Sequence, residues 1–311
     1  MAIVLLFIAF FLFVGLAIDY LYFDAFTPGG PPFPFATVLS LCIAAVVTLT
    51  AYYGGSEIIL GSLGAEKLDI QIPEHREFHN VVTEMALASG SAMPKVYVIY
   101  DPAPNALATG TNKKNAAICV TTGLLILLNR EETQGVVAHE ISHIRNQDVL
   151  LMTLVSILIG GIAILADWVQ RSFYSSRIGR RMGVKGLVII LPLLLLIVLS
   201  PLISRLLAMA VSRQREYLAD ATAVEYTRNP VGLAKALEKI RDAALPFNRV
   251  TRGTAHLFFV NPLLRRLDSR EGVFADLLST HPPMARRIML LYRMAGLHPG
   301  VKGLRVETLK D

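Results

Sequence analysis

The chain has 311 residues, of which 53% are hydrophobic and only 17% are charged, and its mean hydropathy is +0.51. This composition excludes an ordinary soluble protein and indicates a membrane protein long enough for about two domains. The net charge of +6 comes from basic residues that are scattered or flank apolar runs, which favours a membrane surface over nucleic acid as the partner. The two cysteines form no C-x-x-C motif and no disulfide framework, which fits reducing surroundings.

Two apolar runs at the amino end predict a hairpin of membrane-spanning helices. Residues 2–21 carry one charge, Asp19, and have the roughly 20-residue length that crosses a bilayer. A cleaved signal peptide is disfavoured, because no Lys or Arg precedes the run and no small-residue cleavage site follows it. A loop rich in Pro and Gly at 27–34 leads to a second, uncharged run at 35–53. Lys and Arg follow the second run and are absent from the loop, so the positive-inside rule puts residue 60 onward in the cytoplasm.

A small sheet is predicted before the central motif. Residues 74–88 have the apolar spacing of an amphipathic helix. Residues 95–100 read as a strand by their β-branched and aromatic side chains, and 106–109 and 116–121 form two more between turns. An edge of such a sheet can receive an extended peptide by main-chain pairing, but these residues alone favour a structural meander.

The functional interpretation rests on the motif His139-Glu140-Ile141-Ser142-His143. Residues four apart share a face of a helix, so His139 and His143 can bind one metal ion. Glu140 then lies beside the first ligand, where it can take a proton from an attacking water molecule. Apolar neighbours place the helix in a core, where two histidines need a partner, which favours a metal site over two surface histidines.

The motif helix begins at a capping box formed by Asn129 and Glu132, and no breaker separates it from a third apolar run at 149–168. We therefore expect it to continue directly into a membrane segment, with the metal site just off the membrane surface. A basic loop at 170–186 and a fourth apolar run at 187–203, interrupted by prolines, follow. If both runs cross, the basic loop lies outside, against the positive-inside rule, whereas two re-entrant runs satisfy the rule. Four spans are the preferred interpretation.

The third metal ligand is predicted from Glu216 and Asp220, which lie four residues apart on one helix face. A zinc protease uses three protein ligands and leaves one position open. Glu216 can supply the third ligand, while Asp220 can hold a histidine ring through its other nitrogen. Because His143 and Glu216 must meet, the chain between them has to cross the membrane an even number of times.

Three further features are interpreted as structural. His75 and His79 are also four apart, but no glutamate follows the first histidine directly, so this pair is assigned to a solvated helix face. Residues 250–280 show no chemistry of their own. The two arginines at 286–287 follow a turn at the start of a helix, where a structural ion pair is the plainest interpretation.

Four motifs spread over the chain carry a family resemblance. They are His139 to His143 followed by Asn146 and Asp148, Asn105 to Gly110, Arg213 to Asp220, and Ser279 to Pro283 with Arg286. Together with the order of the apolar runs, they resemble the HtpX membrane metalloproteases, relatives of the type I CAAX prenyl proteases.

The resemblance implies a gluzincin-like catalytic domain that faces the cytoplasm, with one zinc ion per subunit on His139, His143 and Glu216. It also implies, in place of the meander, an edge strand that binds substrate backbone, formed by Asn105, Ala106, Leu107 and Ala108. The family more often has Phe where this chain has Leu107, so the pocket beside the strand can differ. His281 is implied near the zinc, as a donor to the tetrahedral oxyanion.

The predicted fold is a mainly α membrane protein, in which transmembrane helices join a gluzincin-like zinc protease domain with a small β-sheet. Its expected parts are a transmembrane hairpin at 1–60, the sheet and motif helix at 61–148, two further apolar membrane segments at 149–209, and the second part of the catalytic domain at 210–311.

The predicted function is a zinc metalloendopeptidase of the inner cell membrane, multi-pass and facing the cytoplasm. The resemblance suggests damaged or misfolded membrane proteins as substrates, a quality-control or stress-response role. A CAAX-type protease with one prenylated substrate is the alternative within enzymes. A catalytically idle zinc-binding membrane scaffold is the alternative outside them, and the presence of Glu140 argues against it.

Overall fold

A computed structural model describes most of the chain, in two compact units. The described residues are 2–22, 30, 33–175, 213–243, 245, 247, 254, 257–260, 282–299 and 306–307. One unit comprises Met1–Tyr53 and Leu154–Ala210, and the other comprises Gly54–Thr153 and Val211–Asp311. The first unit contains the amino-terminal apolar helices, and the second contains the sheet and the histidine motif.

The amino-terminal unit is built on helix α1 (Ala2–Tyr22) and the first part of helix α2 (Phe35–Leu63). In the described part of the chain, α2 is the one continuous helix that is long and apolar enough to cross a membrane. The apolar stretch of α1 counted on the same basis, Val4–Tyr20, is shorter. The predicted fourth apolar run, 187–203, lies outside the described residues, so four spans remain a prediction.

A carboxylate of α1 caps the start of α2. Asp19 accepts hydrogen bonds from the backbone N–H of Ala36 at 3.0 Å and from that of Thr37 at 2.7 Å, and the Thr37 hydroxyl donates to it at 2.6 Å. The first N–H groups of a helix have no partner within the helix, and they carry a partial positive charge that a carboxylate stabilises. The single charge in the first apolar run is therefore stabilised by hydrogen bonds within the hairpin.

The helix that carries the histidine motif does not run on into the third apolar run, contrary to the sequence prediction. Helix α5 (Arg130–Arg145) ends at Asn146, and helix α6 (Asp148–Ser175) begins after a bend of 86°. Gln147 adopts a left-handed conformation, with φ of 62°, which an α-helix cannot continue through. No glycine or proline marks this break in the sequence.

The sheet has four strands in the order β1-β2-β4-β3. They are β1 (Glu66–Lys67), β2 (Lys95–Ile99), β3 (Ala106–Asn112) and β4 (Asn115–Thr121). The three predicted strands are present, but a meander is wrong, because β4 lies between β2 and β3 and pairs with β2 in parallel. The strand order places β3 at the edge of the sheet.

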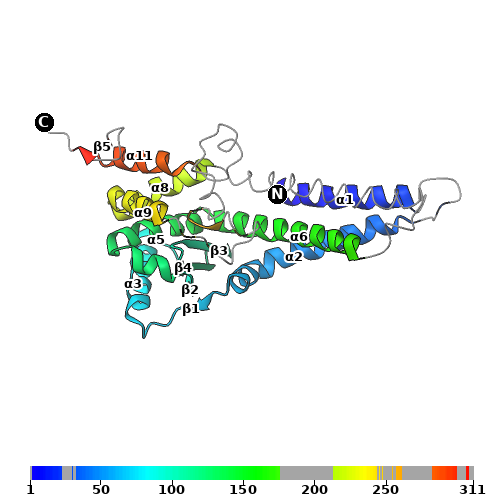
Figure 1. Cartoon of the computed structure of the whole chain (residues 1–311), viewed down its shortest axis with the longest axis horizontal. Helices are drawn as coiled ribbons and strands as arrows, with labels where there is room; N and C mark the ends of the chain where they lie inside the picture. Colours follow the sequence, from blue (N-terminus) through cyan, green and yellow to red (C-terminus); the bar gives the residue numbers. More distant parts are fainter. Residues whose placement is uncertain are drawn as a thin grey trace. The chain divides into compact units, whose positions relative to one another are not determined.

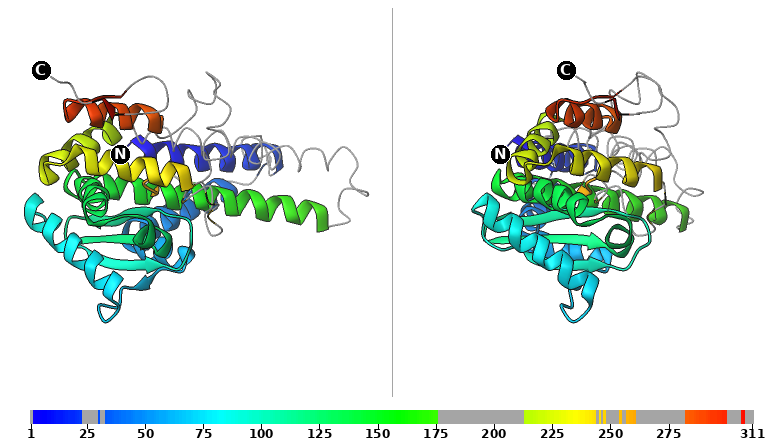
Figure 2. Two further views of the ribbon diagram at one scale, coloured as in Figure 1. Left: turned by 60° about the vertical axis from the view of Figure 1, so that its left-hand side comes forward. Right: turned by 90° about the vertical axis from the view of Figure 1, so that its left-hand side faces the viewer.

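Helix α5 lies between the sheet and a layer of later helices (Figures 1 and 2). It contacts β3 on one side and helices α8 (Arg213–Thr227) and α9 (Pro230–Ala243) on the other. The remaining described elements of this unit are α3 (Pro73–Ser89), α4 (Thr122–Leu127), α11 (Met284–Met294), β5 (His298–Pro299) and β6 (Val306–Glu307). Because α5 is covered on both sides, its apolar residues form the centre of the core, each at most 1% exposed: Val136, Val137, Ala138, Ile141 and Ile144.

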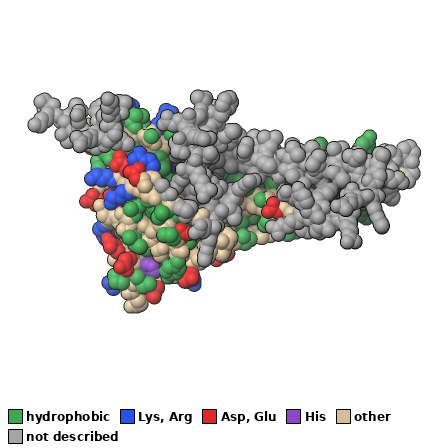
Figure 3. Space-filling view, in the orientation of Figure 1, with side chains coloured by type: hydrophobic (Ala, Val, Ile, Leu, Met, Phe, Trp, Pro, Cys, Tyr) green, Lys and Arg blue, Asp and Glu red, His purple; other side chains and the backbone are tan. Residues whose placement is uncertain are grey.

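The outer surface of this unit carries mixed charge. In Figure 3, acidic and basic side chains are interspersed over the visible described surface around the sheet and the later helices. Such a mixed surface is typical of a part that faces water. A second group of charged side chains lies buried inside the unit.

Candidate metal centre

Helix α5 is fixed in place at its start, well before the histidines. The Asn129 side chain accepts from the Glu132 N–H at 3.0 Å, and the Glu132 carboxylate accepts from the Asn129 N–H at 2.9 Å. These bonds form the predicted capping box. Glu132 also pairs with Lys239 of α9 at 2.7 Å, which ties the start of α5 to the helix that packs on it.

Three buried side chains from two helices converge at one point. His139 and His143 of α5 and Glu216 of α8 each offer one ligand atom, and these atoms all lie within 4.8 Å of one another. The two histidine Nε2 atoms are 3.1 Å apart, and each lies 3.6 to 3.7 Å from a carboxylate oxygen of Glu216. All three side chains are at most 4% exposed. Residues 73 positions apart in the sequence, His143 and Glu216, therefore meet.

Both histidine rings are held from behind by a carboxylate. His139 Nδ1 lies 2.9 Å from Asp220, and His143 Nδ1 lies 3.2 Å from Asp148. A carboxylate accepts hydrogen bonds, so each Nδ1 carries the proton of a neutral imidazole and each Nε2 presents a lone pair. Two lone pairs and a carboxylate that face one another in a buried site repel unless a cation lies among them. The donor set therefore fits a metal ion.

The two histidines differ in the charge that surrounds them. Burial lowers the pKa of His139 to about 4, against the hydrogen bond that His139 donates to Asp220, and the nearby Arg287 lowers it further. Burial also opposes the charged form of His143, but Asp148, Glu216 and Glu140 outweigh it and raise the pKa of His143 above its usual value. A neutral His139 is suited to bind a metal at any ordinary pH, because the ligand must be deprotonated.

Glu140 lies next to the convergent ligands and is 2% exposed. Burial raises its pKa to about 7, and the negative charge of Glu216 acts in the same direction. The charges of His143 and Arg287 and a backbone hydrogen bond from Ala108 of β3 oppose this rise. A carboxylate with a pKa near 7 can both accept and release a proton under neutral conditions.

A buried arginine holds the acidic groups together. Arg287 of α11 is 1% exposed and donates to both oxygens of Asp220, from Nε at 2.8 Å and from Nη2 at 2.7 Å. Its Nη1 lies 3.4 Å from Glu216. The guanidinium counters the burial of Asp220 and lowers the pKa of that carboxyl below its usual range. Arg287 thus neutralises part of a negative cluster that lies in the protein interior.

The structure describes all the predicted site residues except one. Asn105 to Ala108 lie at the start of the edge strand β3, directly opposite the motif helix. His281 lies outside the described residues, so its placement near the metal remains a prediction. Of the other histidine pair, His75 is buried at 4% exposure, so a solvated face is wrong for it; its Nδ1 has no hydrogen-bond partner among the described residues.

The sequence did not indicate three functional features. Asp148 belongs to one of the four motifs, but its bond to His143 depends on the chain break that precedes it. Arg287 rather than its exposed neighbour Arg286 enters the site, although the two are adjacent in the sequence. Residues 257–260, which showed no chemistry of their own, lie against His139 and β3.

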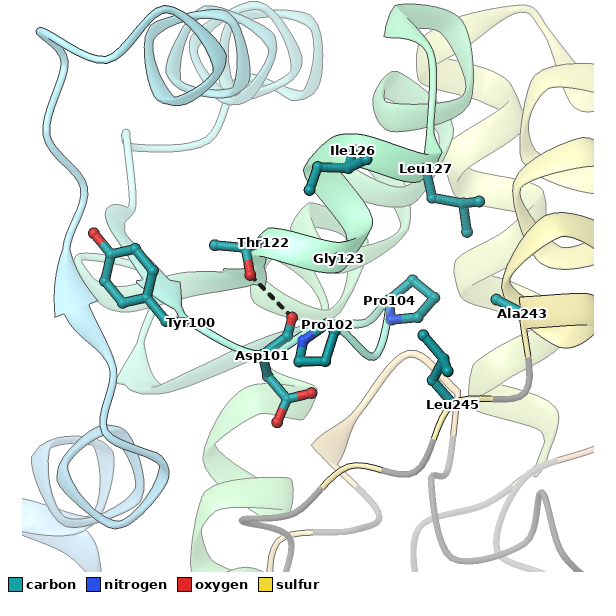
Figure 4. A pocket seen from close by; sticks show the side chains of 10 residues that line it. All are labelled: Tyr100, Asp101, Pro102, Pro104, Thr122, Gly123, Ile126, Leu127, Ala243 and Leu245. Atoms are coloured by element: carbon teal, nitrogen blue, oxygen red, sulfur yellow. Dashed lines mark hydrogen bonds between the residues drawn. The ribbon is translucent and has the colours of Figure 1, made fainter.

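A separate pocket of about 600 Å³ opens beside helix α4 (Figure 4). Its lining is mostly apolar and includes Pro102, Pro104, Ile126 and Leu127. The Thr122 hydroxyl donates to the backbone carbonyl of Asp101 at its wall. No residue of the histidine and glutamate cluster lines this pocket.

Comparison with protein families identifies the class to which this site belongs. The model of peptidase family M48 matches residues 73–295, and the chain therefore belongs to this family of metallopeptidases. Polypeptides are accordingly its class of substrate. The matched range contains α5, α8 and α11, the helices that supply the clustered side chains.

Individual relatives cover most of the chain. A protease HtpX homolog of Caldanaerobacter subterraneus subsp. tengcongensis is 46% identical over 245 residues, which is 78% of this chain and 79% of that protein. A protease HtpX homolog of Streptococcus uberis is 36% identical over 286 residues, 90% of this chain and 91% of that protein. The crystal structure of S. mikatae Ste24p has a similar fold, with a TM-score of 0.50 and 21% identity; the match covers 89% of this chain and 62% of that one.

Replacing Arg287 with Ala should destabilise the protein and weaken metal binding, because Asp220 and Glu216 lose the guanidinium buried beside them. We expect a loss of about 3–5 kcal/mol in the free energy of unfolding, and a fall in zinc affinity of about 10- to 100-fold. Thermal unfolding and zinc competition with a chelator measure the two effects. Arg286→Ala is the matched control, expected within about 0.5 kcal/mol of wild type; equal effects of the two substitutions would contradict the assignment.

The raised pKa of Glu140 gives the metal-free protein a predictable pH dependence. The folded state keeps a proton on Glu140 up to about pH 7, whereas the usual pKa of a glutamate is 4.5, so the free energy of unfolding falls as the pH rises through this window. Glu140→Gln removes the ionisation. We expect the variant to match wild type near pH 4 and to gain on the order of 3 kcal/mol over it by pH 8. Unfolding curves at both pH values, with exposed Glu77→Gln as the control, test this; a gain that does not depend on pH would refute it.

Proposed function

We propose that this chain is a membrane-bound zinc metalloendopeptidase, with His139, His143 and Glu216 as the zinc ligands. The observation that carries the proposal is the convergence of these three buried ligand atoms, with each imidazole held by a carboxylate behind it. Two imidazoles and one carboxylate are a ligand set that catalytic zinc sites use, with a further position left open. Zinc, when bound, lowers the pKa of a water molecule and polarises the carbonyl of the scissile peptide.

Glu140 is the proposed general base. Its buried carboxyl group, with a pKa near 7, takes a proton from the attacking water and later gives it to the leaving amine. Asp220 and Asp148 keep the proton of each imidazole on Nδ1, so that Nε2 stays directed at the metal. His281 is proposed to donate to the oxyanion, and Asn105 to Ala108 to bind substrate backbone.

The proposed substrates are damaged or misfolded membrane proteins. The relatives named as HtpX proteases and the apolar amino-terminal unit support this choice. A CAAX-type enzyme is the alternative, and it would require a prenylated cysteine near the scissile bond. Cleavage of an unprenylated protein such as casein distinguishes the two.

The lipid bilayer is the proposed environment of the amino-terminal unit. Large apolar side chains on α1 and α2 are strongly exposed, among them Leu5 at 60%, Phe13 at 53%, Leu39 at 62% and Val46 at 62%. Apolar surface of this extent is covered in a native protein, and lipid covers it in a membrane protein. We propose a multi-pass protein of the inner cell membrane, with four spans and the catalytic unit in the cytoplasm.

Loss of the base or of the metal should abolish proteolysis. Glu140→Gln should lower the rate of casein cleavage by about 100-fold or more, and a chelator should stop cleavage until zinc is added back. The exposed Glu77→Gln serves as the control and should cleave at the wild-type rate. Full activity of Glu140→Gln would contradict the role of Glu140 as general base.

The proposed topology places the basic loop 170–186 outside the cytoplasm. In a background of Cys42→Ala and Cys119→Ala, the substitution Ile178→Cys should react with a membrane-impermeant thiol reagent added to intact cells. Glu77→Cys, on α3, should react only after lysis. If position 178 does not react with the reagent in intact cells, the result would instead indicate that the last two apolar runs are re-entrant.

A further inference from the structure

The strand proposed to bind substrate is covered in this structure. Asn105, Ala106, Leu107 and Ala108 are each at most 2% exposed, although the strand order puts β3 at the edge of the sheet. An edge strand normally presents a row of N–H and C=O groups to solvent. Another part of the same chain must therefore take the place of solvent along this edge.

Residues 257–260 provide the cover, and they do so as an added strand. Phe258 forms an antiparallel bridge with Leu107, and the Phe259 N–H donates to the Ala106 carbonyl at 2.8 Å. The Asn105 side chain holds both backbone groups of Val260: its Nδ2 donates to the carbonyl at 2.7 Å, and its Oδ1 accepts from the N–H at 3.1 Å. These are main-chain contacts that an extended peptide of almost any sequence could also make.

The same segment reaches the metal ligands. The Phe259 ring packs edge-on against His139, with 4.9 Å between ring centroids. Arg287 lies over the Phe259 ring at 5.0 Å and donates to the Phe259 carbonyl at 3.4 Å. Phe259 therefore occupies the position beside the metal centre that a residue of a bound peptide needs to occupy.

Two further N–H groups of β3 bond to helices of the same unit. A backbone hydrogen bond from Ala108 goes to Glu140 of α5, and the Gly110 N–H donates to Thr153 of α6 at 3.1 Å. Residues 257–260 belong to no described helix or strand, and Phe258 forms only an isolated bridge with Leu107. The part of the edge from Asn105 to Leu107 is thus the part whose partner can be exchanged.

We propose that residues 257–260 occupy the peptide-binding edge of β3 as an internal pseudosubstrate, which an extended apolar peptide replaces by binding antiparallel to β3. The inference rests on the proposed function. The occupying sequence, Leu257-Phe258-Phe259-Val260, defines the chemistry that the edge accepts: an uncharged, apolar stretch with an aromatic side chain against His139. Such stretches are exposed when membrane proteins unfold.

The exchange predicts selection against polar soluble peptides. A tethered segment competes at an effective concentration in the millimolar range, so a free peptide must match its hydrogen bonds and its apolar contacts to displace it. A polar peptide makes the main-chain bonds but leaves the buried positions of Phe258 and Phe259 unfilled.

Removing one hydrogen bond of the segment should raise activity. Val260→Pro lacks the N–H that donates to Asn105, and proline keeps the preceding Phe259 extended. We expect its kcat/KM on casein to rise about fivefold, the effect of one lost hydrogen bond on the closed state. The matched control Val260→Ile keeps the N–H and should stay within about twofold of wild type. If the variant folds normally but cleaves at the wild-type rate or more slowly, residues 257–260 are a permanent part of the site and are not displaced by substrate.

Hydrogen exchange tests the proposal without altering the segment. A casein-derived peptide that wild type cleaves is added to Glu140→Gln loaded with zinc, and exchange is followed at the amides of Phe259 and Val260. Displacement predicts faster exchange at both amides, whereas unchanged or slower exchange refutes the pseudosubstrate. A failure of the proposed function has a different signature, since casein cleavage by wild type would then be insensitive to Glu140→Gln and to chelator.

Discussion

The arrangement of the catalytic unit depends on the cost of burying charge. Glu140, Glu216, Asp220 and Asp148 all lie inside the unit, each at most 7% exposed. Isolated carboxylates in such a setting are strongly unfavourable, and each must be matched by a cation or a hydrogen-bond donor. Arg287 and the two imidazoles supply part of this compensation and the proposed zinc ion the remainder, which is why elements from distant parts of the chain have to meet here.

This requirement explains how helices α5, α8 and α11 are assembled. The motif helix supplies the two histidines proposed as ligands, α8 supplies Glu216 and the carboxylate behind His139, and α11 supplies the arginine that binds that carboxylate. None of the three helices could bury its polar residues alone. Removing one contributor leaves the others with unmatched charge, so the site and the packing of the three helices stabilise each other.

Much of the centre could be predicted because it follows helical periodicity. His139 and His143 share a face, as do Glu216 and Asp220, and the capping box at Asn129 marks where the first helix begins. The choice between Arg286 and Arg287 could not be predicted in the same way. They differ by about 100° around the helix axis, and only the packing of α11 decides which of them points inward.

The features that sequence reasoning got wrong depend on long-range contacts or on unusual backbone. The strand order has β4 between β2 and β3, which no local pattern of the three strands encodes. The break after α5 depends on the left-handed conformation of Gln147. Glutamine is not a residue type from which this conformation is predicted. The role of residues 257–260 comes from partners more than 150 positions away, Asn105 and Ala106.

The first turns of α6 set a fixed distance within the site. Asp148 holds the His143 ring, and Thr153, five residues later, bonds to Gly110 and Thr109 of the edge strand. Asp148 and Thr153 are thus separated by roughly 7.5 Å along the helix axis, which fixes the spacing between the contact to His143 and the contact to the edge strand. Inserting a single residue between them would turn one contact by about 100° relative to the other. The spacing of these two residues is therefore constrained by geometry, whereas the identity of the residues between them is constrained only by packing.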